Sequence, residues 1–386
     1  MKKLVNKALA TAVLASVLAG CASEEDSIVM SPVPKVENSF NTKSLWSTSV
    51  GDGVGTYFSK LKPLYSYEKV FVASRDGVVK ALSPEKGDVI WKVELDQEGP
   101  ARLSGGIASG YGQIFIGSEN GIIYALDEQT GKINWQTKVK GEVLAAPTTD
   151  SNRVIIHSSN GLLMALDEAS GELQWTINTD VPNLTLRGSS QPVTESGGVF
   201  WGTSNGRLAA AIVEQGQLIW QQPVGTAQGA TEIDRLVDVD ASPIILGSTL
   251  YIVGYNGHLI ALDLRTGKQI WKRSYSSATD MVSDGSRLYL VTDKDHIVAV
   301  DARSGTELWK NSLLEYRLVT APSLINGKIV VGDSEGYLYW LDRGTGEFTA
   351  KQNVDSSGFA VGPIAVPDGF IVTTRNGKVK KLTIND

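Results

Sequence analysis

A short motif that recurs along the chain is the feature that most restricts its fold. Each complete copy has a turn, usually Asn-Gly or Asp-Gly, then an alternating strand, a second turn such as Leu-Asp-x-x-Thr-Gly, and a tryptophan 14 positions after the first turn. Six complete copies are followed by two incomplete ones. The tryptophans at this position, including one near the N-terminus without a preceding turn, are Trp46, Trp91, Trp135, Trp175, Trp220, Trp271 and Trp309. Their separations of 38 to 51 residues are typical of four-stranded propeller blades.

The residues within each copy predict antiparallel hairpins. Asn-Gly or Asp-Gly between alternating strands is a strong hairpin signal, because a type I′ turn requires positive φ at both central residues. In the second turn, aspartate accepts backbone N–H groups and glycine adopts the left-handed conformation. A strand with proline near its start precedes most copies, and we expect it to be innermost because proline cannot donate to a further strand. These prolines are Pro147, Pro192, Pro243, Pro322 and Pro363.

Two incomplete copies at the C-terminal end bring the number of blades to eight. The seventh runs from Gly336 to Ala350, where alanine replaces tryptophan, and the eighth starts at Asn376 and has no closing tryptophan. Residues 45–47 (Leu-Trp-Ser) look like the end of a copy that has no beginning. We therefore predict an all-β, eight-bladed β-propeller of four-stranded antiparallel blades over residues 44–386. Pairing of the N-terminal strand with the C-terminal blade closes the ring and removes an exposed sheet edge.

The N-terminal residues indicate export. Lysines precede an apolar run from Ala8 to Leu18, which is shorter than the roughly 20 residues of a spanning helix. The run ends at Leu18-Ala19-Gly20-Cys21, which resembles the lipobox of bacterial lipoproteins. That resemblance implies a signal peptide over residues 1–20 and a lipid on Cys21. Because Ala22 and Ser23 follow in place of an inner-membrane retention aspartate, it also implies the outer membrane. The alternative is an ordinary signal with a coincidental cysteine.

Composition limits the remaining possibilities. Residues 21–43 are polar and include two prolines, so we expect a flexible linker after the lipidated cysteine. Cys21 is the only cysteine, which excludes a disulfide. Removal of three lysines with residues 1–20 changes the formal net charge from −6 to −9. Since the chain has no basic block, nucleic-acid binding is excluded.

The repeat resembles the tryptophan-docking motif of pyrroloquinoline-quinone dehydrogenases over nearly the whole mature chain. This leaves open a periplasmic quinone-dependent dehydrogenase or a scaffold in which the tryptophans only dock the blades. Dehydrogenases of that class add a Ca²⁺ site, a catalytic aspartate and in many cases a disulfide. Here the aspartates fall chiefly in turns, and no cluster of oxygen ligands is evident. His157, His258 and His296 occupy repeat-equivalent positions without ligand spacing. We predict no catalytic residue, metal or cofactor.

Two connections between blades depart from the repeat. The distance from a closing tryptophan to the next inner proline is 12 residues after Trp135, but 17 after Trp175 and 23 after Trp220. The two long connections are of the same type at adjacent junctions, so we expect them side by side on one face of the ring. Departures from a repeat are where function concentrates.

The contents of these connections are typical of a protein interface. The first contains Leu184-Thr185-Leu186-Arg187, an alternating segment with two leucines and a guanidinium. The second contains a short helical turn followed by Asp238 and Asp240, two carboxylates on one side of a strand. Apolar groups rimmed by charges of both signs favour partner binding. The alternative is that the leucines cover the propeller's own core and the charges pair internally.

The lipoprotein signal, the eight-bladed quinoprotein-type repeat, and the stretches DVPNLTLRG and TEIDRLVDVD together resemble the BamB family of propeller lipoproteins, over essentially the entire chain. The resemblance implies a non-enzymatic scaffold of the β-barrel assembly machinery, which assists folding and insertion of outer-membrane β-barrel proteins from the periplasmic side. In that family both loops dock onto a POTRA domain of BamA. By position, the implied partner-binding residues are Leu184, Leu186, Arg187, Asp238 and Asp240. A further hypothesis is that inner-strand edges pair with unfolded outer-membrane proteins.

Overall fold

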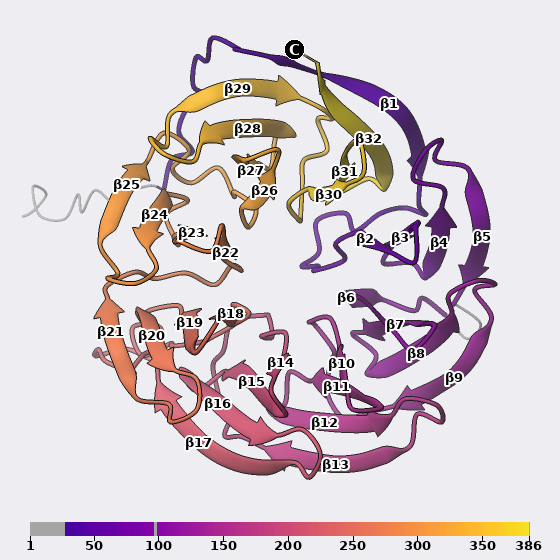
Figure 1. Ribbon diagram of the computed structural model, residues 1–386, viewed down its shortest axis with the longest axis vertical. Coiled ribbons are helices and arrows are strands. Elements are labelled where there is room, and N and C mark those ends of the chain that lie inside the picture. The colour runs from indigo at the N-terminus through magenta and orange to yellow at the C-terminus, as the bar shows by residue number, and fades with distance from the viewer. Residues whose placement is uncertain (1–27, 96–98, 386) are drawn as a thin grey trace, which may run out of the picture.

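The computed structural model describes residues 28–95 and 99–385. These residues form eight four-stranded antiparallel sheets arranged as a ring (Figure 1), which confirms the predicted all-β, eight-bladed propeller. Within these two ranges, no helix is long and apolar enough to cross a membrane. The predicted signal peptide and Cys21 lie outside the described residues.

Each blade runs from an innermost strand near the ring axis to an outermost strand at the rim (Figure 1). Blades 1 to 4 consist of β2 (Leu64–Ser66), β3 (Lys69–Ala73), β4 (Val78–Leu82) and β5 (Val89–Glu94); β6 (Leu103–Gly110), β7 (Gln113–Ser118), β8 (Ile122–Asp127) and β9 (Ile133–Lys138); β10 (Thr148–Asp150), β11 (Arg153–His157), β12 (Leu162–Asp167) and β13 (Leu173–Asn178); and β14 (Val193–Glu195), β15 (Gly198–Thr203), β16 (Arg207–Ile212) and β17 (Gln217–Pro223). Blades 5 to 8 consist of β18 (Ile244–Leu246), β19 (Thr249–Val253), β20 (Leu259–Asp263) and β21 (Gln269–Arg273); β22 (Val282–Ser283), β23 (Arg287–Val291), β24 (Ile297–Asp301) and β25 (Glu307–Asn311); β26 (Ser323–Ile325), β27 (Lys328–Gly332), β28 (Tyr337–Asp342) and β29 (Phe348–Asn353); and β30 (Ile364–Val366), β31 (Gly369–Thr373), β32 (Lys378–Asn385) and β1 (Asn41–Ser49).

The two ends of the chain close the ring as predicted. Strand β1 pairs antiparallel with β32, with Thr42 opposite Ile384 and Ser49 opposite Lys378. The five prolines singled out in the sequence each precede an innermost strand, which is the position expected for a residue without an N–H group.

The segment before β1 lies against the ring. Strand β1 begins at Asn41, three residues before the predicted start at residue 44. The N–H of Ser31 donates to the Glu315 carbonyl at 3.0 Å, and the N–H of Ser39 donates to the Thr349 carbonyl at 2.8 Å. The sequence places residues 31–39 in the predicted linker, because they show no strand period. Their contacts use backbone and short polar side chains, which leave no periodic signal.

The closing tryptophans lie between neighbouring blades. Trp135 donates from Nε1 to the Glu168 carbonyl of the next blade at 2.8 Å, and its ring covers Gly171 in the same turn. At Gly171 φ is +74°, and a Cβ there would lie 2.5 Å from the ring, so the turn needs glycine for both backbone and space. Six of the seven tryptophans donate such a bond across the seam: Trp46, Trp91, Trp135, Trp175, Trp271 and Trp309.

The alanine that replaces tryptophan in blade 7 has a topological cause. In blade 8 the outermost strand is β1, so the turn that would receive a tryptophan from blade 7 is interrupted by the two chain ends. Phe40, directly before β1, packs with Ala350 in one apolar cluster. Its ring meets Trp340 edge-on, with centroids 5.4 Å apart and an interplanar angle of 86°. The seam is therefore filled by an aromatic side chain from the N-terminal segment.

Candidate partner-binding surface

The two enlarged connections lie together on one face of the ring. They are the 179–192 loop, between β13 and β14, and the 224–243 loop, between β17 and β18. The N–H of Leu186 donates to Oδ2 of Asp238 at 3.0 Å, and Oγ of Ser190 donates to the Ala241 carbonyl at 2.8 Å. These bonds join the loops directly, which agrees with the expectation that adjacent connections emerge side by side.

The 179–192 loop exposes apolar side chains at its centre. The Leu184 side chain is 41% exposed, whereas Leu186 is half-buried and lines a cavity together with Lys60, Tyr255 and Asp280. The sequence predicted an extended segment, but the backbone bends at Asn183, Leu184 and Arg187 and pairs with no strand of the described residues. Neither leucine belongs to a core cluster of the described residues. The structure therefore does not support the alternative in which both leucines cover the core of the propeller.

Arg187 is held by two carboxylates and still reaches solvent. Its guanidinium donates to Glu142 at 2.9 and 3.2 Å and lies 3.4 Å from Glu119, while the side chain remains 48% exposed. Glu119 is also bound by Arg75 at 3.0 and 2.8 Å, and Arg75 stacks over the Tyr57 ring at 3.8 Å. The bond to Glu119 raises the pKa of Arg75. This network fixes the direction of Arg187 before any partner arrives.

The 224–243 loop begins with a capped turn. Thr231 and Asp234 bond each other reciprocally, from the N–H of each to the side-chain oxygen of the other, at 3.1 Å in both cases. The N–H of Arg235 donates to the Thr231 carbonyl at 3.1 Å, which completes the short helical turn that the sequence predicted. Ile233 at the tip is 73% exposed. Sequence reasoning did not single out Ile233, although an isoleucine among polar loop residues was a usable signal.

The structure places Asp238 and Asp240 beneath the surface, where they cannot meet a partner directly. They retain only 1% and 4% exposure. Asp238 accepts the N–H groups of Leu186 and Val239, at 3.0 and 2.8 Å, so its carboxylate orients the neighbouring loop. The prediction that both residues face one side holds, but that side is the interior of the loop pair. Burial raises the pKa of both carboxyls, and the charge of Asp240 adds to the shift at Asp238.

Lys60, which the sequence did not identify, ties both loops to the opposite part of the ring. It belongs to the connection between β1 and β2, and its Nζ donates to the Ser189 carbonyl at 3.0 Å and the Asp240 carbonyl at 2.8 Å. Asp280 lies 3.8 Å from the same ammonium. No motif marks a single lysine that acts through carbonyl groups of distant loops, so the sequence carried no usable signal.

The histidines and repeated aspartates have structural partners. His157 is buried beneath the 179–192 loop with Nδ1 3.1 Å from the Ser190 carbonyl, His258 lies 3.2 Å from the Val224 carbonyl, and His296 lies 3.2 Å from Glu315. In the repeated turns, aspartate accepts N–H groups of its own turn, as Asp127 does from Thr130 at 2.8 Å. Over residues 28–95 and 99–385, no group of three or more potential ligands is arranged to hold a metal ion.

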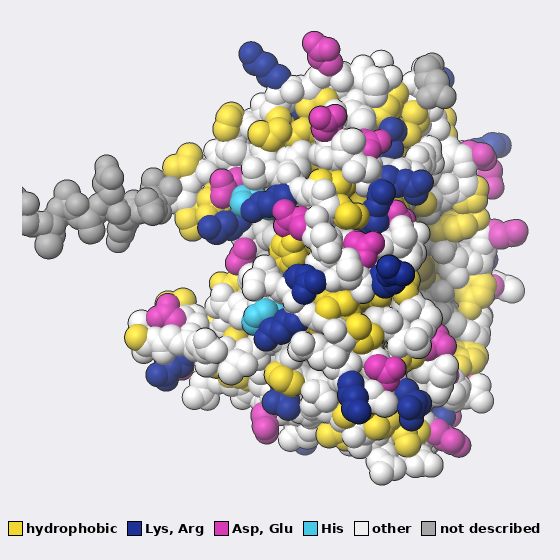
Figure 2. Space-filling view, turned by 60° about the vertical axis from the view of Figure 1, so that its left-hand side comes forward, with side chains coloured by type: hydrophobic (Ala, Val, Ile, Leu, Met, Phe, Trp, Pro, Cys, Tyr) yellow, Lys and Arg dark blue, Asp and Glu magenta, His cyan; other side chains and the backbone are white. Residues whose placement is uncertain are grey.

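Charges of both signs are interspersed over the side of the molecule drawn in Figure 2, without an extended area of one sign.

Comparison with known proteins assigns the chain to a family. The family model described as "Outer membrane protein assembly factor BamB" matches residues 75–311 and 293–386. A relative of the same name from Aliivibrio fischeri is 68% identical over 384 residues, covering 100% of both chains. The crystal structure of BamB from Moraxella catarrhalis superposes with a TM-score of 0.80 at 26% identity, covering 89% of this chain and 100% of that one.

The resemblance to quinone enzymes is one of fold. A quinohemoprotein alcohol dehydrogenase from Comamonas testosteroni superposes with a TM-score of 0.71 at only 14% identity, covering 90% of this chain and 78% of that one. Because the sequence identity is so low, the match shows a shared fold and gives no reason to assign dehydrogenase activity to this chain. The family model and the full-length relatives lead to a different conclusion: the chain belongs to the BamB family of outer membrane protein assembly factors.

Proposed function

We propose that this chain is a non-enzymatic scaffold subunit of the β-barrel assembly machinery that binds a POTRA domain of BamA through the 179–192 and 224–243 loops. In this role it assists folding and insertion of outer-membrane β-barrel proteins. The observation that carries the proposal is the pair of interlocked loops, which present Leu184, Arg187 and Ile233 to solvent on one face. The proposed role in outer-membrane protein assembly is supported by full-length relatives that are named outer membrane protein assembly factors.

The described contacts suggest how the surface works. Leu184 and Ile233 would enter apolar depressions of the partner, with Leu186 behind them. Arg187 would exchange one of its present carboxylates for a partner group, because its planar guanidinium can bond two acceptors at once. Asp238 and Asp240 would act as positioning residues that hold the backbone of Leu186 in place.

The proposed location rests on the N-terminal sequence. A lipid on Cys21 would anchor the mature chain to the outer membrane, with the propeller in the periplasm and residues 22–30 as the connection. Residues 31–39 lie against the ring, so this connection is shorter than the 21–43 linker that the sequence suggested.

The test is a double substitution, Leu186→Ala with Arg187→Ala. We expect it to weaken binding of the full chain to the BamA POTRA region by roughly 2 kcal/mol or more, because interface energy concentrates in a few anchors. Binding should be measured by calorimetry, after circular dichroism has shown an intact fold. The matched control is Leu173→Ala with Arg265→Ala, an exposed pair distant from both loops, which should bind normally. Normal binding by both folded doubles would rule out this surface.

The lengths of the inner strands do not favour the second hypothesis, that unfolded barrel proteins pair with their edges. Seven of the eight innermost strands have three or fewer residues, and only β6 (Leu103–Gly110) is longer. Such short edges offer few backbone groups to an incoming strand.

A further inference from the structure

The N-terminal segment occupies a groove between the outermost strands of blades 6 and 7, which shows that such a groove can hold an extended peptide. Residues 35–37 lie along the groove between the outermost strands β25 and β29, beside Asn311, Leu313 and Phe348. The segment continues along the free edge of β29. There the side chain of Asn38 bonds the N–H and carbonyl of Lys351, at 2.8 and 3.0 Å.

Backbone and side-chain groups of the rim share this binding. The Thr349 carbonyl accepts the N–H of Ser39 at 2.8 Å. Nζ of Lys351 donates to the Pro34 carbonyl at 2.8 Å. The rim thus contributes a strand edge, which bonds any extended backbone, and a lysine that bonds a peptide carbonyl.

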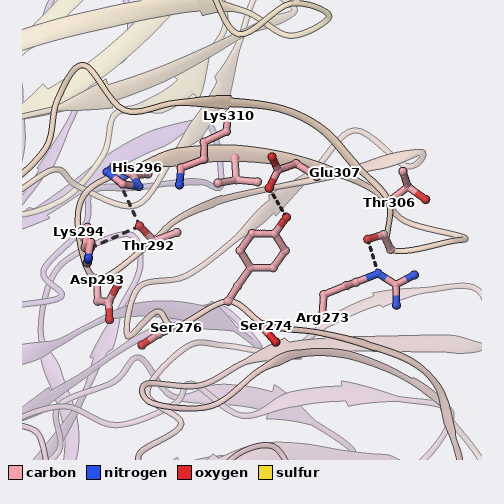
Figure 3. A pocket seen from close by; sticks show the side chains of 13 residues that line it. Arg273, Ser274, Ser276, Thr292, Asp293, Lys294, His296, Thr306, Glu307 and Lys310 are labelled. Carbon is pink, nitrogen blue, oxygen red and sulfur yellow. Dashed lines mark hydrogen bonds between the residues drawn. The ribbon is translucent and has the colours of Figure 1, made fainter.

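The groove one seam earlier, between β21 and β25, is the repeat equivalent of this site. Ala261 opposes Trp271 in one blade and Ala299 opposes Trp309 in the next, so Arg273 and Tyr275 correspond to Asn311 and Leu313. This second groove has a volume of about 690 Å³ (Figure 3). We call it the rim groove.

Strand β25 offers the rim groove the same edge that β29 offers the N-terminal segment. It is the outermost strand of its sheet and pairs only with β24. By the repeat, Lys310 corresponds to Lys351 and Leu308 to Thr349. The Leu308 side chain is 45% exposed, so apolar surface lies next to the unpaired backbone groups.

The side chains of the rim groove favour negative charge. Arg273, Lys294 and Lys310 line it, and none of them forms an ion pair with a carboxylate of the described residues. The Arg273 guanidinium donates to the carbonyls of Lys272, Ser304 and Gly305, whereas the ammonium groups of Lys294 and Lys310 bond no group of the described residues. Two carboxylates are also present. Glu307, which is labelled in Figure 3, accepts the Tyr275 hydroxyl at 2.5 Å, and Asp293 directly precedes Lys294 in the sequence. His296, which faces the same groove, bonds Glu315. The cations outnumber the anions by three to two, in a chain whose net charge is −6.

We propose that the rim groove binds an extended segment of another polypeptide that carries an acidic residue. The peptide would bond the edge of β25 through a backbone N–H at Leu308 and through a side-chain amide at Lys310, as Ser39 and Asn38 bond β29. A carboxylate of the peptide would lie among Arg273, Lys294 and Lys310, and Tyr275 would pack against its apolar part. This site is separate from the two loops and does not depend on the function proposed for them.

A designed peptide tests the proposal. The probe is a fluorescein-labelled decapeptide with the sequence of residues 31–40, in which the position of Lys35 is glutamate, with both ends blocked. Binding to the full chain is followed by fluorescence anisotropy. We expect saturable binding, weakened roughly tenfold or more by Lys294→Glu with Lys310→Glu, because that pair reverses the charge of the groove.

A matched variant and a crosslink distinguish binding of the peptide in the rim groove from non-specific attraction between the acidic peptide and surface lysines. Lys132→Glu with Lys140→Glu makes the same charge change at exposed lysines of blade 2 and the turn after it, away from the rim groove, and should leave affinity unchanged. The same peptide with benzoylphenylalanine in its last position should crosslink to residues 273–276 or 305–311. Absence of saturable binding, equal weakening by both doubles, or crosslinks to residues 345–351, which would mean exchange with the N-terminal segment, each overturns the proposal.

Discussion

Individual side chains in the loop pair show where sequence reasoning succeeds and where it cannot. Leu184 and Arg187 are exposed as expected from an alternating segment in a long connection. Asp238 and Asp240 share one side, which their spacing predicts, but spacing cannot tell which side faces solvent. Lys60 was missed because its partners are carbonyl groups of loops far along the chain. A residue's role can be predicted when it depends on local pattern, and not when it depends on which loops meet.

His157 makes stability depend on pH in a way that one substitution can isolate. Burial lowers its pKa from the ordinary 6.5 to about 4, although the Ser190 carbonyl opposes the shift. The folded chain therefore holds the imidazole neutral, while the unfolded chain protonates it below about pH 6.5. The resulting stabilisation is complete above pH 6.5 and is lost as pH falls toward 4.

We expect the stability advantage of the natural chain over His157→Gln to shrink by about 3 kcal/mol between pH 7 and pH 4. Glutamine can still donate to the Ser190 carbonyl but does not titrate. Urea unfolding of both proteins across this range measures the difference, and contributions from Asp238 and Asp240 cancel because both chains contain them. Parallel pH profiles for the two proteins would contradict a neutral buried imidazole.

At the scale of the secondary-structure element, the seam between blades is a repeated contact of tryptophan on glycine. The repeat spacing predicted the strands, the turns and the blade number, because each depends on residues within one copy. It also located the tryptophans between blades. The Ala350 exception could be seen in the sequence, but its partner Phe40 could not, since Phe40 reaches that seam from the opposite end of the chain.

Gly171→Val should destabilise the propeller by about 2 kcal/mol or more, because the added atoms meet both a left-handed backbone and the Trp135 ring. Gly112→Val is the control. Its φ of +72° is close to that of Gly171, but no atom lies within 4 Å of the added Cβ. Thermal unfolding should show a clearly larger loss of Tm for Gly171→Val. Equal losses would mean that backbone strain alone, without the tryptophan, explains the glycine.

At the scale of the whole molecule, closure of the ring depends on both ends of the chain. The sequence predicted the pairing of the first strand with the last, because a copy without a beginning and a copy without an end are complementary. It did not predict that residues 31–40, which precede β1, lie along blade 7 and form hydrogen bonds with it. That segment has no hydrophobic period, and its contacts were visible only once the ring had brought blade 7 next to β1.

Phe40→Ala should lower the free energy of unfolding by about 3 kcal/mol, through loss of a buried ring against Trp340. Denaturant unfolding measures the change. Leu45→Ala, which removes a 44% exposed side chain from β1 itself, is expected to cost much less. A Phe40 variant as stable as the Leu45 variant would show that the ring stays closed without the aromatic contact.

The attachment of residues 31–40 also determines how the molecule resists mechanical force. Tension applied through the N-terminus reaches first the bond between Ser31 and Glu315, and then the buried Arg317, which donates to the Ser31 carbonyl at 2.7 Å and pairs with Asp333 at 2.8 Å. The pairing of β1 with β32 comes under tension only after these bonds, and those of Pro34, Asn38 and Ser39 to blade 7, have ruptured. A force on the N-terminus is therefore resisted first by the contacts of residues 31–40 with the outside of the propeller, before it can separate β1 from β32.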